Sequence, residues 1–242
     1  TQSASWGFKI VAVSEISLSP AGDINADGKD DLVIGAASQA YNGRIQAGVV
    51  YVYYGHALGY SFSYLDTSAW VTGTHGFRVF GTAAGDQFGC SISGGVDINA
   101  DGVSDLVIGA RYADPYGRSD AGTVSIIFGS ISGVLGDIDT ANISPGRGFQ
   151  IFGAVAGDLF GASVAVLKDF DGDLLGDIIV GAYWADPGGL TSAGLVSIIY
   201  GQMESPTVAP TIVITAQPTP APVIHPTVSP TTTVQPTAVA RY

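Results

Sequence analysis

Three short segments rich in aspartate hold the residues of this chain that could do chemistry. The first offers side-chain oxygens at alternate positions, from Asp23, Asn25, Asp27 and Asp31. The backbone carbonyl of Lys29 can supply one more oxygen from the same turn. Calcium is a hard cation that takes roughly six to eight oxygen ligands, and alternate residues of a tight loop can point inward to supply them. The segment is therefore predicted to bind calcium.

The same arrangement returns twice, 74 and then 72 residues further along the chain. The second segment offers Asp97, Asn99, Asp101 and Asp105 with the carbonyl of Val103, and the third offers Asp169, Asp171, Asp173 and Asp177 with the carbonyl of Leu175. Repetition at a fixed period indicates a repeat architecture in which each unit carries one site. Three calcium sites are therefore expected.

A glycine follows the third side-chain ligand in two of the three segments. Gly28 and Gly102 stand where the loop has to turn sharply. The third segment instead has Gly172 one ligand earlier and places Leu174 at the turn. The third segment is therefore the one that departs from the pattern of the other two.

Two other interpretations of these segments were weighed. An EF-hand needs a glutamate at the twelfth position and flanking helices, but Ile34, Ile108 and Val180 stand there, within strand-like sequence. The segments could also be aspartate-rich turns without a metal. Carboxylates gathered so closely repel one another unless a cation is present, and this favours the metal loop.

The remaining composition argues against several other functions. The formal net charge is −12, from 21 acidic and 9 basic residues, so the basic footprint of a nucleic-acid-binding protein is absent. The three histidines, His56, His75 and His225, do not recur with the repeat and stand in no catalytic motif. No apolar run approaches the roughly 18 residues of a membrane span. We expect a protein that is not an enzyme.

Each repeat also contains segments typical of short strands. Residues 47–55, 121–129 and 193–201 are β-branched and aromatic runs bounded by glycine. Residues 76–81 and 148–153 share the pattern Gly-Phe-x-Ile/Val-Phe-Gly, and each leads through an Ala-Gly-Asp-x-Phe-Gly turn to another short strand. Four antiparallel strands per repeat describe a propeller blade. The fold is predicted to be all-β, with three blades in repeats at about residues 7–75, 76–147 and 148–202.

The composition changes at about residue 203. Eight of the 12 prolines lie between Pro206 and Pro236, mixed with threonine, valine and alanine. Such a stretch favours extended polyproline II structure and is typical of O-glycosylated stalks. Residues 203–242 are therefore predicted to form an extended, glycosylated tail that docks on the protein, with a short strand-like patch at residues 211–215. Asn142-Ile-Ser144 is the only sequon for N-glycosylation, and Pro145 directly after it argues against its occupancy.

Taken together, the aspartate loops, the following Asp-Leu-Val-Ile-Gly-Ala strands, the Gly-x-Val-Tyr-Val strand and the Phe-Gly turns resemble FG-GAP repeats, the blades of the integrin alpha-subunit propeller. The resemblance covers roughly residues 7–201. It implies structural calcium ions on one rim and an extracellular or cell-surface location, and the start at Thr1 fits a secreted chain whose signal peptide was removed. The chain departs from the family where proline should follow Gly-Ala, and in having three blades instead of seven.

The two ends of the repeat array do not match. The third repeat runs into Gln202 without a Gly-Phe-x-Ile strand, whereas Gly7–Val11 supplies that pattern before the first blade. Since three blades are too few for an ordinary ring, the N-terminal strand is predicted to complete the third blade of another chain by strand addition. Successive additions produce a filament, or a ring if the rotation closes. The alternative is a fragment of a longer propeller.

We therefore predict a calcium-stabilised extracellular structural or adhesion protein that assembles head to tail into a surface fibre. The alternative is a glycan-binding module, because the segments 112–116 and 183–187 place tyrosine or tryptophan beside Asp-Pro. These aromatics could instead pack between adjacent blades. Glycans or surface proteins are the expected partners in addition to further copies of the chain.

Overall fold

The computed structural model describes residues 9–11, 15–56, 64–67, 70–133, 135–201 and 212–214. Within these ranges the chain forms β-strands and short 3-10 helices, and no helix there is long and apolar enough to cross a membrane. The predicted all-β fold is confirmed. The 3-10 helices η2 (Pro115–Gly117), η3 (Thr140–Asn142), η4 (Pro145–Arg147) and η5 (Pro187–Gly189) lie in connections between strands.

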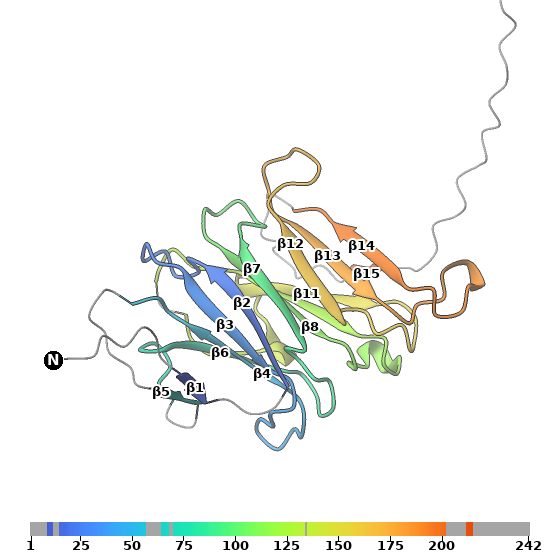
Figure 1. Ribbon diagram of the computed structural model, residues 1–242, viewed down its shortest axis with the longest axis horizontal. Helices are drawn as coiled ribbons and strands as arrows, with labels where there is room; N and C mark the ends of the chain where they lie inside the picture. Colours follow the sequence, from blue (N-terminus) through green and yellow to red (C-terminus); the bar gives the residue numbers. More distant parts are fainter. Residues whose placement is uncertain are drawn as a thin grey trace, which may run out of the picture.

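Three sheets stand side by side like slices, one for each repeat (Figure 1). The first contains β2 (Ile16–Gly22), β3 (Asp31–Ala36), β4 (Val49–Tyr53) and β6 (Gly76–Phe80). The second contains β7 (Ser91–Val96), β8 (Asp105–Ala110), β9 (Thr123–Ile127) and β11 (Gly148–Gly153). The third contains β12 (Ser163–Leu167), β13 (Asp177–Ala182) and β14 (Leu195–Ile199). Consecutive strands of each sheet pair antiparallel, as in a propeller blade.

The first two sheets are one strand wider than predicted. β10 (Ile138–Asp139) joins β6 in parallel, and β15 (Ile212–Ile214) joins β11 in the same way. β15 coincides with the strand-like patch expected at residues 211–215, and the rest of the tail lies outside the described residues. The sequence does not predict β10, because the strand is only two residues long. Ion pairs from Arg78 to Asp137 and from Arg44 to Asp139 fasten this segment to the first sheet.

The core lies between the sheets, because the long apolar strands bury both of their faces. One cluster joins the first and second sheets through residues such as Val50, Val52 and Ile108. A second joins the second and third sheets through residues such as Val124 and Ile178. Each sheet is thus stabilised mainly by its neighbours, as in other repeat proteins.

Glycine permits the closest approach between the sheets. A Cβ atom on Gly35 would lie 2.2 Å from the Gly89 carbonyl oxygen, and one on Gly109 would lie 2.0 Å from that of Gly161. Both glycines belong to the repeated Gly-Ala at the end of a Leu-Val-Ile strand. Gly89 and Gly161, which they approach, each end the Phe-Gly turn of the following repeat. The two repeated motifs therefore meet at the junction between blades.

The N-terminal strand lies apart from the three sheets. β1 (Lys9–Val11) pairs in parallel with β5 (Tyr64–Asp66) to form a separate two-stranded sheet. This pair lies beside the first sheet, at the opposite end of the row from β14 (Figure 1). The third sheet contains no fourth strand among the described residues, as expected from its sequence. β6, which opens the second sequence repeat, is the outer strand of the first sheet.

Candidate metal centres

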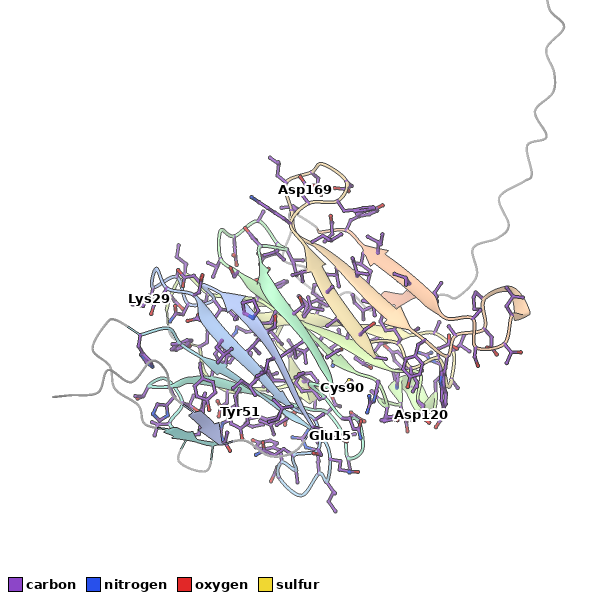
Figure 2. The ribbon with its side chains drawn as sticks, viewed as in Figure 1. Glu15, Lys29, Tyr51, Cys90, Asp120 and Asp169 are labelled. Atoms are coloured by element: carbon purple, nitrogen blue, oxygen red, sulfur yellow. The ribbon has the colours of Figure 1, made fainter. Side chains whose placement is uncertain are left out.

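The three aspartate loops connect the first and second strands of each sheet. All three lie on one rim of the molecule, where Lys29 of the first loop and Asp169 of the third are labelled in Figure 2. Glu15 and Asp120 mark the opposite rim. Successive loops are also hydrogen-bonded: the Asp23 carbonyl accepts from the Ser104 amide at 3.3 Å, and the Asp97 carbonyl from the Gly176 amide at 2.7 Å. The rim is therefore a continuous backbone structure.

Each loop is wound around its own side-chain oxygens. In the first, the Asp23 carboxylate accepts the amides of Asp27 and Gly28 at 2.9 and 2.8 Å. The amide of Asp27 also reaches Asn25 Oδ1, at 3.1 Å, and the amide of Lys29 reaches Asp27 Oδ1 at 3.0 Å. These are the turns that Asx side chains form readily. They draw the first, third and fifth positions of the loop towards its inside.

The other two loops repeat this winding. The Asp97 carboxylate accepts the amides of Asp101 and Gly102, and the Asp101 carboxylate accepts the amide of Val103. In the third loop Asp169 accepts the amides of Gly172 and Leu174, so that Gly172 donates in place of the fifth-position residue, and Asp173 accepts the amide of Leu175. Asn99 of the second loop accepts the amide of Asp101. Asp171 stands at the same position in the third loop, and its carboxylate accepts the amide of Asp173. All three loops are thus wound around the carboxylate of their first aspartate, with one changed donor in the third.

The last aspartate of each loop fastens it to the sheet. One carboxylate oxygen of Asp105 accepts the Ile98 amide at 2.8 Å, and the other accepts the Gly129 amide at 2.9 Å. Asp31 and Asp177 make the equivalent pairs of bonds. These three side chains are at most 3% exposed. Sequence reasoning proposed them as ligands and missed this second role, because the glycine amides lie 24 residues away in sequence.

Burial makes the carboxylates of Asp31 and Asp105 reluctant to ionise. Desolvation raises the pKa of Asp31 to about 6 and that of Asp105 to about 7, although two amides favour the charged form of each. The carboxylates of the same loop, Asp27 and Asp101 first among them, raise these pKa values further. A nearby cation would oppose both effects. The electrostatics of the loops therefore suit a bound positive charge.

The third loop brings three carboxylates together. Oxygens from Asp169, Asp171 and Asp177 all lie within 4.8 Å of one another. In the part of the chain that the structure describes, no other trio of histidine, cysteine or acidic side chains comes so close. The first two loops place asparagine, which is uncharged, at the position of Asp171. The third loop therefore has the highest density of negative charge.

Two residues in each loop have left-handed backbone conformations. Gly28 and Gly102 both have φ of 84°, as expected for the sharp turn. Leu174 occupies the same place in the third loop at φ 74°, while Gly172 takes the earlier left-handed position that Ala26 and Ala100 occupy elsewhere. The third loop therefore follows the common backbone path at these two positions. It keeps that path with a leucine in a conformation that disfavours side chains.

These donors fit calcium in kind. Every predicted side-chain ligand offers oxygen, which hard cations prefer, and no thiol or imidazole belongs to the loops. When bound, the ion would be held by the carboxylate or side-chain amide oxygens of the first, third, fifth and ninth loop positions, together with the backbone carbonyl of the seventh. Its contribution would be to offset the repulsion among carboxylates on the rim.

A cavity of about 360 Å³ opens between the second and third sheets near the opposite rim. Asp158, only 8% exposed, lines it with Asp186 and Trp184. Burial, and then the charge of Asp186, raises the pKa of Asp158. Trp184 is 57% exposed and Tyr183 49%, so neither ring is buried between the second and third sheets. The cavity thus combines an accessible aromatic surface with two carboxylates.

The FG-GAP repeat family matches residues 17–53, 88–127 and 160–199. Each match begins near the first strand of one sheet, spans its aspartate loop and ends with the third strand. The chain is built on three FG-GAP repeats. The resemblance inferred from the motifs is thereby confirmed.

Curated relatives belong to two kinds of protein. Phosphatidylinositol-glycan-specific phospholipase D of Bos taurus is 32% identical over 74% of this chain and 19% of its own length. Integrin alpha-5 of Xenopus laevis is 32% identical over 68% of this chain and 14% of its own length. Integrin alpha pat-2 of Caenorhabditis elegans is 29% identical over 75% of this chain and 14% of its own length. The chain thus spans about a fifth or less of the curated relatives it matches.

Proposed function

We propose that this chain is a calcium-stabilised structural or adhesion protein of the cell surface, whose copies assemble head to tail into a fibre. The observation that supports it best is the mismatch between the ends of the array. Among the described residues no strand pairs with the outer edge of β14, and β1 pairs with β5 alone, outside the three large sheets. Strand addition satisfies both at once. The integrin relatives favour a surface location and adhesion.

Calcium has a structural role in this proposal. The three loops are hydrogen-bonded to the sheets and to one another, which suits a fixed structural role. Extracellular calcium modules often bind at about 10⁻⁴–10⁻³ M, so millimolar calcium keeps them loaded. No catalytic role is proposed, although some relatives carry the name of a phospholipase.

Two measurements test the proposal. Excess chelator should lower the melting temperature, since a site at 100 times its Kd adds about 2.7 kcal/mol to the free energy of unfolding. An unchanged melting curve would refute the calcium part. Deletion of residues 1–12 should convert assemblies into monomers by light scattering. Assembly equal to that of the parent chain would refute strand donation.

Glycan binding is the second candidate, and the cavity beside Trp184 favours it. A sugar could stack its apolar face on the exposed indole while its hydroxyl groups donate to Asp158 and Asp186. Titration with monosaccharides in solution tests this function. Their binding is measured by quenching of tryptophan fluorescence in the parent chain and in Trp184→Ala. Equal weak quenching in both proteins would exclude a sugar site at Trp184.

A further inference from the structure

We infer that the third sheet is completed by β1 and β5 of a second copy, acting together as a two-stranded unit and in one fixed register. This rests on the proposed head-to-tail assembly and specifies its contacts. The junction between copies then repeats the two junctions that already exist between blades within the chain. Four independent features of the structure lead to this conclusion.

The first feature is a parallel pairing that occurs three times. An outer strand pairs with a segment that follows the third strand of the next sheet, with the partners Val79 and Ile138, Ile151 and Ile212, and Ile10 and Leu65. The first residue of each pair stands at the same place in the Gly-Phe-x-Ile/Val motif. In the first two cases the outer strand also joins an antiparallel sheet, through β4 or β9. β1 with β5 therefore corresponds to the outer part of a sheet whose inner strands the described part of this chain does not supply.

The second feature is the exposed surface of β14. Its counterparts in β4 and β9 are fully buried, because an outer strand lies beside them and another sheet covers them: Val50, Val52, Val124 and Ile126 are all 0% exposed. The equivalent Val196 is 67% exposed and Ile198 is 40% exposed. Burial of such apolar surface is favourable by about 25 cal/mol per Å². β14 therefore presents both an open edge and an apolar face.

The third feature is a pair of contacts at the Phe-Gly turns. Ser17 Oγ donates to the Gly89 carbonyl of the next repeat at 2.7 Å, and Ser91 Oγ donates to that of Gly161 at 2.7 Å. Ser163 is the next serine in this series and is exposed. The residue equivalent to Gly89 and Gly161 in the first repeat is Glu15, which shares their positive φ, at 59°. Ser163 of one copy and Glu15 of the next complete the series.

The fourth feature is the space around Gly181. Its counterparts Gly35 and Gly109 are covered by the following repeat within about van der Waals contact, so that a Cβ there would collide with backbone. A Cβ on Gly181 would meet only atoms of Ser163. The glycine thus leaves room for a neighbour that the described chain does not supply. The hydrogen bonds between successive loops on the calcium rim end in the same way. By correspondence with Asp23 and Asp97, the next acceptor in the series is the carbonyl of Asp169. By correspondence with Ser104 and Gly176, the next donor is the amide of Asp30.

These features require a second copy because of where the parts lie. β1 and β5 adjoin the first sheet, at the far end of the row from β14, so a chain cannot complete its own third sheet without rearrangement (Figure 1). The pairs Tyr51 with Arg78 and Ser125 with Gln150 set the register of the existing outer strands. By the same correspondence, Ser197 lies opposite Lys9 of the second copy.

Disulfide formation between two singly substituted chains tests this register. The single cysteine is first removed by Cys90→Ser, and full-length chains carrying Lys9→Cys or Ser197→Cys are mixed in calcium and treated with diamide. Opposed residues of antiparallel strands have Cβ atoms about 4.5–5.5 Å apart, close to disulfide geometry. We expect a covalent dimer in the mixture and none in either chain alone.

Ile10→Cys is the matched control, since a shift of one residue turns the thiol to the other face of the sheet. Equal cross-linking of Ile10→Cys, or assembly by light scattering without a cross-link to Lys9→Cys, would overturn the register while leaving head-to-tail assembly intact. Failure of the parent chain to assemble at all would overturn the proposed function, and the inference with it.

Gly181→Ala provides a second test that does not depend on thiols. Its added Cβ should block the partner's Glu15 turn and abolish assembly, while the melting temperature of the monomer stays unchanged or rises, because alanine is favoured over glycine within a strand. Gly109→Ala, the same change at an internal junction, should instead destabilise the monomer. Unimpaired assembly of Gly181→Ala would exclude this packing between copies.

Discussion

The buried aspartate that ends each loop offers the most informative single perturbation. Asp105 is fully buried, and its two oxygens accept amides from Ile98 and Gly129 at 2.8 and 2.9 Å. Asp105→Ala removes both acceptors. A buried donor left without a partner costs about 1–3 kcal/mol, so the substitution should lower the free energy of unfolding by about 2–6 kcal/mol. For a chain of this size, each kcal/mol corresponds to about 2–4 °C in melting temperature.

The assay separates this effect from loss of a metal ligand. Thermal unfolding of Asp105→Ala is compared with that of Asp101→Ala, a loop ligand that is exposed, in calcium and in excess chelator. Both substitutions should weaken the stabilisation by calcium. In chelator, only Asp105→Ala should remain strongly destabilised, because its amide bonds do not depend on the ion. If the two variants melt at the same temperature in chelator, the structural role assigned to Asp105 is wrong.

Three further outcomes are expected. Leu174→Gly should raise the free energy of unfolding by about 1–2 kcal/mol, since φ of 74° strains a leucine, and denaturant unfolding that shows a loss instead would contradict this. Burial, followed by the charge of Asp114, raises the pKa of Asp86 from 3.8 to about 6. The contribution of Asp86 to the free energy of unfolding is therefore greatest below about pH 4 and falls as the pH rises to about 6. Asp86→Asn should remove this decline, with exposed Glu15→Gln as the control, and an unchanged pH profile of the melting temperature would count against it. Intact mass spectrometry of the secreted chain should exceed 24.7 kDa if the tail is glycosylated, and the bare mass would exclude that modification.

Predictions of local structure from the sequence succeeded where a motif repeated with its spacing intact. The strands after each loop, the positive φ at Gly28 and Gly102, and the lack of a fourth strand after β14 within the described residues all follow from short-range patterns that occur two or three times. The third loop departs from the motif, because its glycine has moved to Gly172. The backbone keeps the same path there because the same oxygens organise it, and Leu174 accepts the strain.

The sequence by itself determined the blades, their loops and the imbalance between the two ends of the chain, since each depends on residues close together in a repeated motif. Only the tertiary structure decided the contacts that join residues from different repeats. These include the second role of Asp105, the parallel strands β10 and β15, and the pairing of β1 with β5. A parallel pair of two or three residues leaves almost no periodic signal, and its partners lie about 55–60 residues apart. It forms because the packed sheets bring an outer strand beside the loop of the next blade.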